Sequence, residues 1–177
     1  MGLFTGIEDA DLFQRGKFLT PDFVGVLEVR KTVAFQTRSH GMAFIVEFEI
    51  LESNKPEGTT RTIQVDGAEK VVADAFPVGT KATWFQKLSD KDIAFPAIKA
   101  FVAVLSGYTL DQKDKIDEEL SPELADLLDT CTETPDDNPL VGLRINVTTT
   151  GVVTKNNRDF TRHDWDPYVY PETEGSD

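Results

Sequence analysis

Cysteine is almost missing from this chain. Its 177 residues contain one cysteine, Cys131, so an intramolecular disulfide bond is excluded and a reducing compartment is favoured. The chain also lacks the roughly 18 consecutive apolar residues of a membrane-spanning helix. Residues 1–9 show neither the basic region nor the apolar run of a secretion signal. We therefore expect a cytoplasmic protein that does not enter a membrane.

Motifs for catalysis and metal binding are also lacking. The two histidines, His40 and His163, have no paired cysteines and no His-Glu-x-x-His sequence beside them, so a zinc site has no support. Residues 79–81 read Gly-Thr-Lys like the end of a phosphate-binding loop, but the upstream glycine is missing, and no Gly-x-Ser-x-Gly sequence occurs. The aspartates at 111, 114 and 117 do not have the alternate spacing of a calcium loop. We predict no enzymatic activity, no cofactor and no metal site.

Positive charge is in short supply, because 18 lysines and arginines face 31 acidic residues and give a net charge of −13. The acidity is concentrated in two places. Residues 111–137 hold eleven acidic residues and two lysines, and residues 164–177 hold five acidic residues and no base. The remainder of the chain is close to neutral and can carry a local basic groove. The composition therefore neither requires nor excludes a nucleic-acid partner.

Alternating apolar and polar residues predict strands in the first half of the chain. Residues 24–35 and 43–51 alternate on either side of a turn at 37–41 and predict an antiparallel hairpin. Residues 81–88 predict a third strand. Residues 61–78 are ambiguous and contain at most a short strand over 62–65.

One segment has a strong helical pattern. Pro96 suits a first helical turn, and apolar residues follow from Ile98 to Leu105 at helical spacing. Gly107 stands where a C-terminal cap belongs. The sequence therefore predicts a helix from Pro96 to Leu105.

The acidic segment 111–137 contains a further helix start at Ser121, with a stripe of leucines on an otherwise anionic helix. Residues 141–147 and 160–165 predict a fourth and a fifth strand. The polar residues 168–177 predict a disordered acidic tail.

Three strands, a helix and two strands follow one another in the order of the oligonucleotide-binding (OB) fold. A parallel sheet fits less well, because the chain lacks the crossover connections that it needs. We therefore expect a mainly β protein with a five-stranded OB-type Greek-key barrel and one helix between strands three and four. The expected divisions are a lead-in over 1–20, a barrel domain over 21–167 that carries the acidic insertion 111–137, and a disordered tail over 168–177.

Three stretches of the chain resemble small single-stranded-DNA-binding proteins that tailed bacteriophages encode in replication and recombination gene clusters. They are residues 16–51, residues 77–107, and residues 141–147 with the aromatic positions that follow. The resemblance implies an OB fold, a DNA partner, an acidic tail that recruits other proteins, and a place in the host cytoplasm. The acidic segment 111–137 is longer than in that pattern, and Asp177 stands where some of these proteins end in an aromatic residue.

Single-strand binding requires cations along the phosphates and aromatic faces for the bases. Lysines, arginines and aromatic residues of this kind occur on the predicted third, fourth and fifth strands and on the loops 1–2 and 4–5. The predicted nucleic-acid-binding residues are Arg38, Lys81, Trp84, Phe85, Lys87, Arg144, Lys155, Arg158, Phe160 and Arg162. Each aromatic could instead fill the core, and each cation could be solvated. Trp84 and Phe85 point to opposite faces of a strand, so at least one of them should face outward.

The favoured hypothesis is sequence-tolerant binding of single-stranded DNA in phage replication or recombination, with basic partner proteins recruited by the tail. Two alternatives stay open. The acidic segment could make the protein a DNA mimic or an inhibitor that binds a partner, with the barrel as a scaffold. The chain could also be a structural component of a virion, since β-barrels build such particles as well. Binding of a labelled oligonucleotide at low salt separates the first hypothesis from the others.

Overall fold

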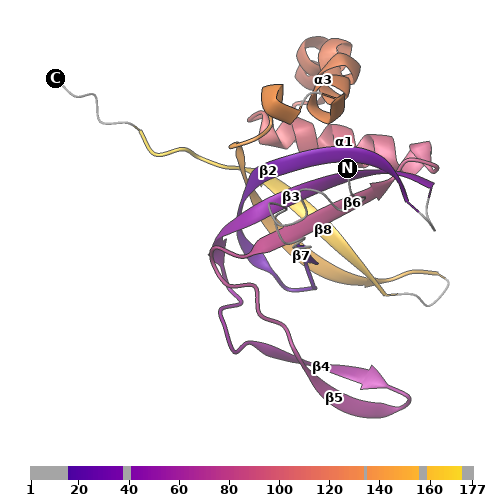
Figure 1. The fold of residues 1–177 in the computed structure, drawn as a ribbon, viewed down its shortest axis with the longest axis vertical. Helices are drawn as coiled ribbons and strands as arrows, with labels where there is room; N and C mark the ends of the chain where they lie inside the picture. The colour runs from indigo at the N-terminus through magenta and orange to yellow at the C-terminus, as the bar shows by residue number, and fades with distance from the viewer. Residues whose placement is uncertain (1–15, 38–40, 134, 156–158, 173–177) are drawn as a thin grey trace, which may run out of the picture.

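The computed structural model describes residues 16–37, 41–133, 135–155 and 159–172 of the protein. These residues form a mainly β fold, in which a six-stranded sheet curls into a half-barrel and a few helices pack against it (Figure 1). The expected mainly β class is confirmed. The strands follow one another in the sheet in the order β1 (Lys17–Phe18), β6 (Lys81–Lys87), β3 (Gly41–Ser53), β2 (Val24–Thr37), β7 (Arg144–Val153) and β8 (Asp159–Pro167).

All neighbouring strands run antiparallel except β1, which pairs with β6 in parallel. Five strands were expected, and β1 is the sixth. It comes from the segment that was assigned to the lead-in, whose Leu19 is also buried in the core. The sheet therefore begins earlier in the chain than the alternating pattern indicated, because two residues are too few to show a period.

The β2–β3 hairpin has the alternation that the sequence predicted, with apolar side chains such as Val29, Val46 and Phe48 turned inward. The pairing shifts register twice along β2, first between Val26 and Leu27 and again after Val29. Both Val26 and Leu27 are buried, which a regular alternation would not allow. Such bulges increase the local bend and twist of a strand, so they help to curl the sheet.

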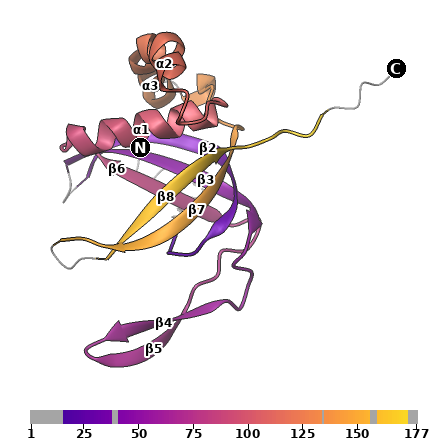
Figure 2. The same ribbon diagram turned by 180° about the vertical axis from the view of Figure 1, so that it is seen from behind.

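Aromatic rings fill the interior of the half-barrel. Trp84 of β6 and Trp165 of β8 lie with their ring centroids 5.4 Å apart, although three strands separate them in the sheet. Phe101 of helix α1 (Lys91–Leu105) contacts these two rings at 4.9 and 5.1 Å. The side chain of Phe101 therefore joins β6 to β8, and Figure 2 shows α1 lying across the half-barrel.

Helix α1 ends as predicted but begins five residues earlier. It starts at Lys91, so Pro96 lies inside the helix and not in its first turn, and this part of the prediction was wrong. Gly107 has a φ of +97°, and the N–H of Tyr108 donates to the carbonyl of Ala103 at 3.0 Å. A Schellman motif therefore ends the helix, with glycine at the left-handed position.

The ambiguous region 61–78 forms a separate hairpin of β4 (Thr60–Val65) and β5 (Ala68–Ala73). The two residues of its turn, Asp66 and Gly67, have φ angles of +52° and +78°, as a type I′ turn requires. The hairpin projects from the half-barrel, and nearly all of its residues are exposed (Figure 1). An Asp-Gly pair between two short strands is a strong hairpin signal, so this element could have been predicted.

The acidic segment lies outside the sheet, as expected, and its residues Asp114, Asp117 and Glu118 are exposed. It forms α2 (Lys113–Lys115), a π-helical turn (Ile116–Leu120), α3 (Ser121–Glu133) and a 3₁₀ turn (Pro135–Asp137). Thr32 of β2 attaches it to the sheet, because its buried hydroxyl donates to the carbonyl of Cys131 at 3.1 Å. The amide of Asn138 donates to the same hydroxyl at 2.6 Å.

Strand β7 starts three residues later than predicted and continues to Val153. Val141 was expected to point inward, but it lies in a turn before Gly142 and is 42% exposed. Strand β8 contains the whole of the predicted segment 160–165. Within the described residues, no helix is both long and apolar enough to cross a membrane.

Candidate nucleic-acid interface

A groove with a volume of about 410 Å³ lies between β6 and β8 and beside α1. In the described part of the chain, these two strands share no backbone pairing, so the sheet leaves a seam there. The indole rings of Trp84 and Trp165 line the seam, together with the polar side chains of Gln86 and His163. The two indole rings are largely buried in the core, so the seam presents mainly polar side chains and the edge of the aromatic core.

His163 stacks on Trp165, with their ring centroids 5.4 Å apart and their planes inclined by 25°. Burial lowers the pKa of His163 to about 4, and the Thr161 carbonyl and the Asp164 charge oppose this shift only in part. The imidazole is therefore neutral near pH 7, and its buried Nε2 atom has no hydrogen-bond partner among the described residues.

The β7–β8 hairpin brings together three of the predicted binding residues. Phe160 is 57% exposed at the mouth of the groove, next to Arg162, which also lines it. Lys155 is exposed in the connection between the two strands. The guanidinium of Arg162 lies 3.2 Å from the carboxylate of Asp164, so part of its charge is already balanced.

Strand β6 carries four predicted residues on two faces. Trp84 is 5% exposed and packs in the aromatic core, so its assignment as a surface for stacking bases is wrong. Phe85 points to the other face and is half-buried, which agrees with the expectation that one of the pair faces outward. Lys81 and Lys87 are exposed at opposite ends of the strand, about 20 Å apart for six residues of extended chain.

The structure places Lys87 and the β7–β8 hairpin on the same side of the half-barrel. Figures 1 and 2 show the C-terminal end of β6, where Lys87 lies, on the side where β7 ends and β8 begins. Lys81 lies at the other end of β6, where its register partner on β3 is Glu49. The end of β6 that carries Lys87 and the hairpin that carries Lys155, Phe160 and Arg162 therefore lie on one side of the half-barrel, whereas Lys81 lies at the other end of β6. Arg38 and Arg158 lie outside the described residues.

Arg144 does not point a free charge toward a ligand. Its Nε atom lies 3.0 Å from Glu28, which also lies 3.1 Å from Arg30, and Arg30 in turn pairs with Glu49. This row of alternating charges crosses β7, β2 and β3 on the outer face of the sheet. Assigning Arg144 to a phosphate contact is therefore not supported, because its cation is already paired with a carboxylate.

The first residues of the expected tail also contact Arg144. The Tyr170 hydroxyl accepts a hydrogen bond from the Arg144 backbone N–H at 2.8 Å, and Tyr168 lies beneath the guanidinium, which is 5.6 Å from its ring centroid. The two tyrosine rings also meet edge to face, at 4.9 Å. The chain is therefore docked on β7 as far as Tyr170, and a disordered tail cannot begin at Tyr168.

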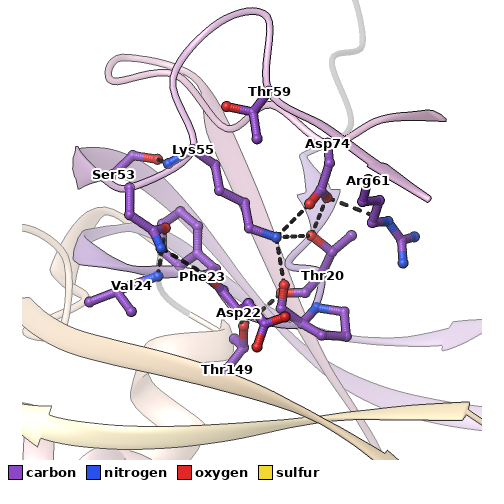
Figure 3. A network of polar contacts seen from close by, with 12 residues as sticks. Thr20, Asp22, Phe23, Val24, Ser53, Lys55, Thr59, Arg61, Asp74 and Thr149 are labelled. Carbon is purple, nitrogen blue, oxygen red and sulfur yellow. Dashed lines mark hydrogen bonds and ion pairs between the residues drawn. The ribbon is translucent and has the colours of Figure 1, made fainter. Parts of the chain in front are cut away.

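A buried polar network, which the sequence did not reveal, joins the β4–β5 hairpin to the half-barrel (Figure 3). The ammonium group of Lys55, which is 6% exposed, donates to Asp74 at 2.5 Å, to the carbonyl of Pro21 at 2.5 Å and to the hydroxyl of Thr20 at 3.1 Å. Arg61 lies 3.6 Å from Asp74 on the hairpin side. Burial alone would raise the pKa of Asp74, but its hydrogen bonds from Lys55 and Thr20 and the nearby positive charges lower it.

Two residues of the seam, Gln86 and His163, were not predicted as binding residues. The sequence contained a signal for His163, because it stands two residues before Trp165 on the same strand face. Gln86 follows Trp84 by the same spacing. Among the described residues, no group of three or more His, Cys, Asp and Glu side chains could hold a metal ion.

Comparison of the chain with models of protein families, with curated proteins and with solved structures finds no match in any of the three.

Proposed function

We propose that the protein binds single-stranded DNA with little sequence preference, through the β6–β8 seam and the β7–β8 hairpin. The observation that carries this proposal is the exposed Phe160, which lines the groove together with Arg162, on a hairpin whose connection carries the exposed Lys155. Aromatic faces next to cations are what single-strand binding needs, because bases stack on the rings and phosphates contact the cations.

We also propose that the half-barrel is a variant of the OB fold. Five of its strands follow the sheet order β6-β3-β2-β7-β8, and α1 lies between β6 and β7 in the chain. In this reading, β1 and the β4–β5 hairpin are additions to the five-stranded core. OB folds bind oligonucleotides near strands two and three and near the 1–2 and 4–5 loops. Here, β6 and the β7–β8 connection take these places, which supports the location of the proposed site.

In the proposed complex, a base stacks on Phe160, and a second base edge reaches Gln86 in the seam. Lys155, Lys87 and Arg162 contact phosphates. The net charge of −13 makes this binding weak at high salt, since few cations face a polyanion.

The biological role rests on the resemblance to phage-encoded proteins. We propose that the protein protects or presents single strands during phage DNA replication or recombination. The residues after Tyr170 hold three acidic residues and no base, so they suit the recruitment of basic partner proteins.

Titration of a labelled oligothymidylate at several salt concentrations tests the proposal. We expect wild type to bind at low salt and Lys155→Ala to lower the slope of log K against log salt by about 0.7. Phe160→Ala should cost about 1–3 kcal/mol with little change in slope. Lys70→Ala and Phe18→Ala are the matched controls, because Lys70 is exposed on the β4–β5 hairpin and Phe18 is 64% exposed on β1. Equal losses in variant and control would place the site elsewhere.

One observation favours a second candidate function. The acidic side chains of the helical segment are exposed from Asp111 to Asp129, as they would be in a protein that imitates the phosphates of DNA. The two functions separate in the same titration. A wild-type protein that binds no oligonucleotide at low salt but inhibits binding of DNA by a basic protein would be a mimic.

A further inference from the structure

A second and larger groove, with a volume of about 750 Å³, lies between α1 and α3. Phe95 and Ile98 of α1 form one wall, and Leu124, Ala125 and Leu128 of α3 form the other. Phe44 of β3 contributes to the floor. Ala97 and Ala100 on another side of α1 line the β6–β8 seam, so the helix separates the two grooves.

The apolar side chains at this groove exceed what the core needs. Ile98 is buried and packs in the core, but Phe95, which also lines the groove, is 53% exposed. The leucines of α3 are only half-buried. An apolar surface of this extent, hollowed between two helices, is typical of a docking site for another protein.

The shape of the groove suits a helix. The α3 wall is a stripe that repeats every three or four residues from Ser121 to Thr132. At 1.5 Å per residue this stripe is about 16 Å long, or about three helical turns. The α3 stripe is a row of helical side chains against which another helix can pack, as in other helix-in-groove interfaces, and Phe95 and Ile98 of α1 close the other side over about one turn.

The charge around the groove selects a basic partner. Lys99, the cation among the lining residues, is bound to Asp117 with an N–O distance of 2.5 Å. Asp129 lines the groove, and the exposed Asp126, three residues before it, is its neighbour on the surface of α3, outside the lining row. Both belong to the acidic segment 111–137, in which acidic residues outnumber bases by nine.

We propose that this groove binds an amphipathic helix of a partner protein. Its apolar face lies against Phe95, Leu124 and Leu128, and lysines or arginines on its flank face Asp126 and Asp129. This interaction does not depend on the DNA site, because the two grooves lie on different sides of α1.

Two synthetic helical peptides of about five turns serve as probes. Both peptides have the same face of leucines. At all remaining positions one peptide carries lysine and the other carries glutamate. Fluorescence anisotropy measures their affinity for the full chain. We expect the lysine peptide to bind at least about tenfold more tightly than the glutamate peptide, since like charges across an interface are unfavourable. Equal affinities would overturn the charge argument and the proposal with it.

Variants locate the binding on the protein. Phe95→Ser removes an exposed side chain of the groove, and Ala125→Trp fills the space between the helices. Each should weaken the lysine peptide by about tenfold or more, as truncation or blockage of an interface centre does. Phe18→Ser, which removes an equally exposed phenylalanine from β1, should leave the affinity unchanged. If Phe95→Ser and Phe18→Ser behave alike, the groove is not the site, and this comparison decides even if Ala125→Trp does not fold.

Two double variants, each of which replaces two aspartates by lysines, complete the test. Replacing Asp126 and Asp129 together by lysine should reverse the preference between the two peptides, whereas the same change at Asp111 and Asp114 should not. A second copy of the chain could fill the groove instead of a partner helix. Sedimentation of wild type and Phe95→Ser tests this by measuring whether each is a monomer or a dimer. A wild-type dimer that Phe95→Ser converts to a monomer would show that self-association fills the groove and would overturn the proposal.

Discussion

His163 is neutral because of its position in the structure. Its ring is packed on Trp165 in the seam between β6 and β8, where water is largely excluded and Asp164 is the nearby charge that favours the proton. Desolvation disfavours the charged imidazolium, so the folded protein binds this proton more weakly than the unfolded chain does. The residue therefore links the stability of the fold to pH.

The pKa of His163 falls from an ordinary value of 6.5 to about 4 on folding. Its contribution to stability is therefore complete above pH 6.5 and is lost as the pH falls toward 4. We predict that unfolding by urea becomes easier over this window by up to about 3 kcal/mol, from about 1.4 kcal/mol for each unit of pKa.

The matched variant is His163→Gln, which keeps a polar side chain but has no proton to gain. Its stability should change less than that of wild type between pH 6.5 and 4. The His40→Gln variant is the control, because it also removes one of the two histidines of the chain but keeps His163. A wild type and a His163→Gln variant with the same pH dependence would contradict the assignment.

The sequence allowed some side chains to be placed and left others unresolved. Alternation required one of Trp84 and Phe85 to face outward, and the shared spacing of Phe85 with Lys81 and Lys87 could have identified it. The pairing of Arg144 could not be predicted in this way. It depends on the register of β2 against β7, which brings Glu28 opposite Arg144 across 116 residues of chain.

At the scale of elements, the β4–β5 hairpin is the part that has least packing around it. A two-stranded hairpin is at best marginally stable alone in water. The network at its base compensates, because Lys55 and Asp74 join it to the segment before β2, at Thr20 and Pro21. All three N–H donors of the Lys55 ammonium are used in these bonds.

We predict that Asp74→Asn destabilises the protein by about 3 kcal/mol, because it leaves the buried ammonium of Lys55 without its carboxylate. Urea denaturation at neutral pH measures the loss. Asp66→Asn is the control, since it makes the same chemical change at the exposed turn of the same hairpin, where asparagine tolerates a positive φ. Similar stabilities of the two variants would mean that the network does not hold the hairpin in place.

Elements whose apolar pattern repeats over many residues were predicted from the sequence. The ends of elements were predicted less well, because turns and contacts with other elements decide them. The β2–β3 hairpin and the third strand were identified by alternation. The start of α1 was missed because Pro96 suits a first turn, although the tertiary contacts of Ala94 extend the helix before it. Strand β7 was placed too early because the apolar pattern continues through the turn at Val141.

At the scale of the whole molecule, the fold separates the charges that the composition mixes. The helical segment, which holds eleven of the 31 acidic residues, packs on α1 and β2, on the side away from the β7–β8 hairpin (Figures 1 and 2). The hairpin and the end of β6 keep Lys87, Lys155 and Arg162. The charge totals alone could not show this arrangement, since it depends on which element covers which side of the sheet.

Tyr170 is the last residue with a described contact on β7, and the chain after it carries three acidic residues and no base. Ending the chain at Tyr170 removes three acidic residues and changes the net charge from −13 to −10. We predict that this truncation tightens oligothymidylate binding at low salt and that the gain disappears at high salt, where the screening length falls to a few ångströms. Salt titrations of both chains measure the effect.

The control replaces Asp111, Asp114 and Glu118 by their amides, which removes the same charge from the helical segment. A larger gain for the truncation than for the control would show that the tail competes locally with the DNA. Equal gains would reduce the effect to net charge, and weaker binding after truncation would contradict the prediction.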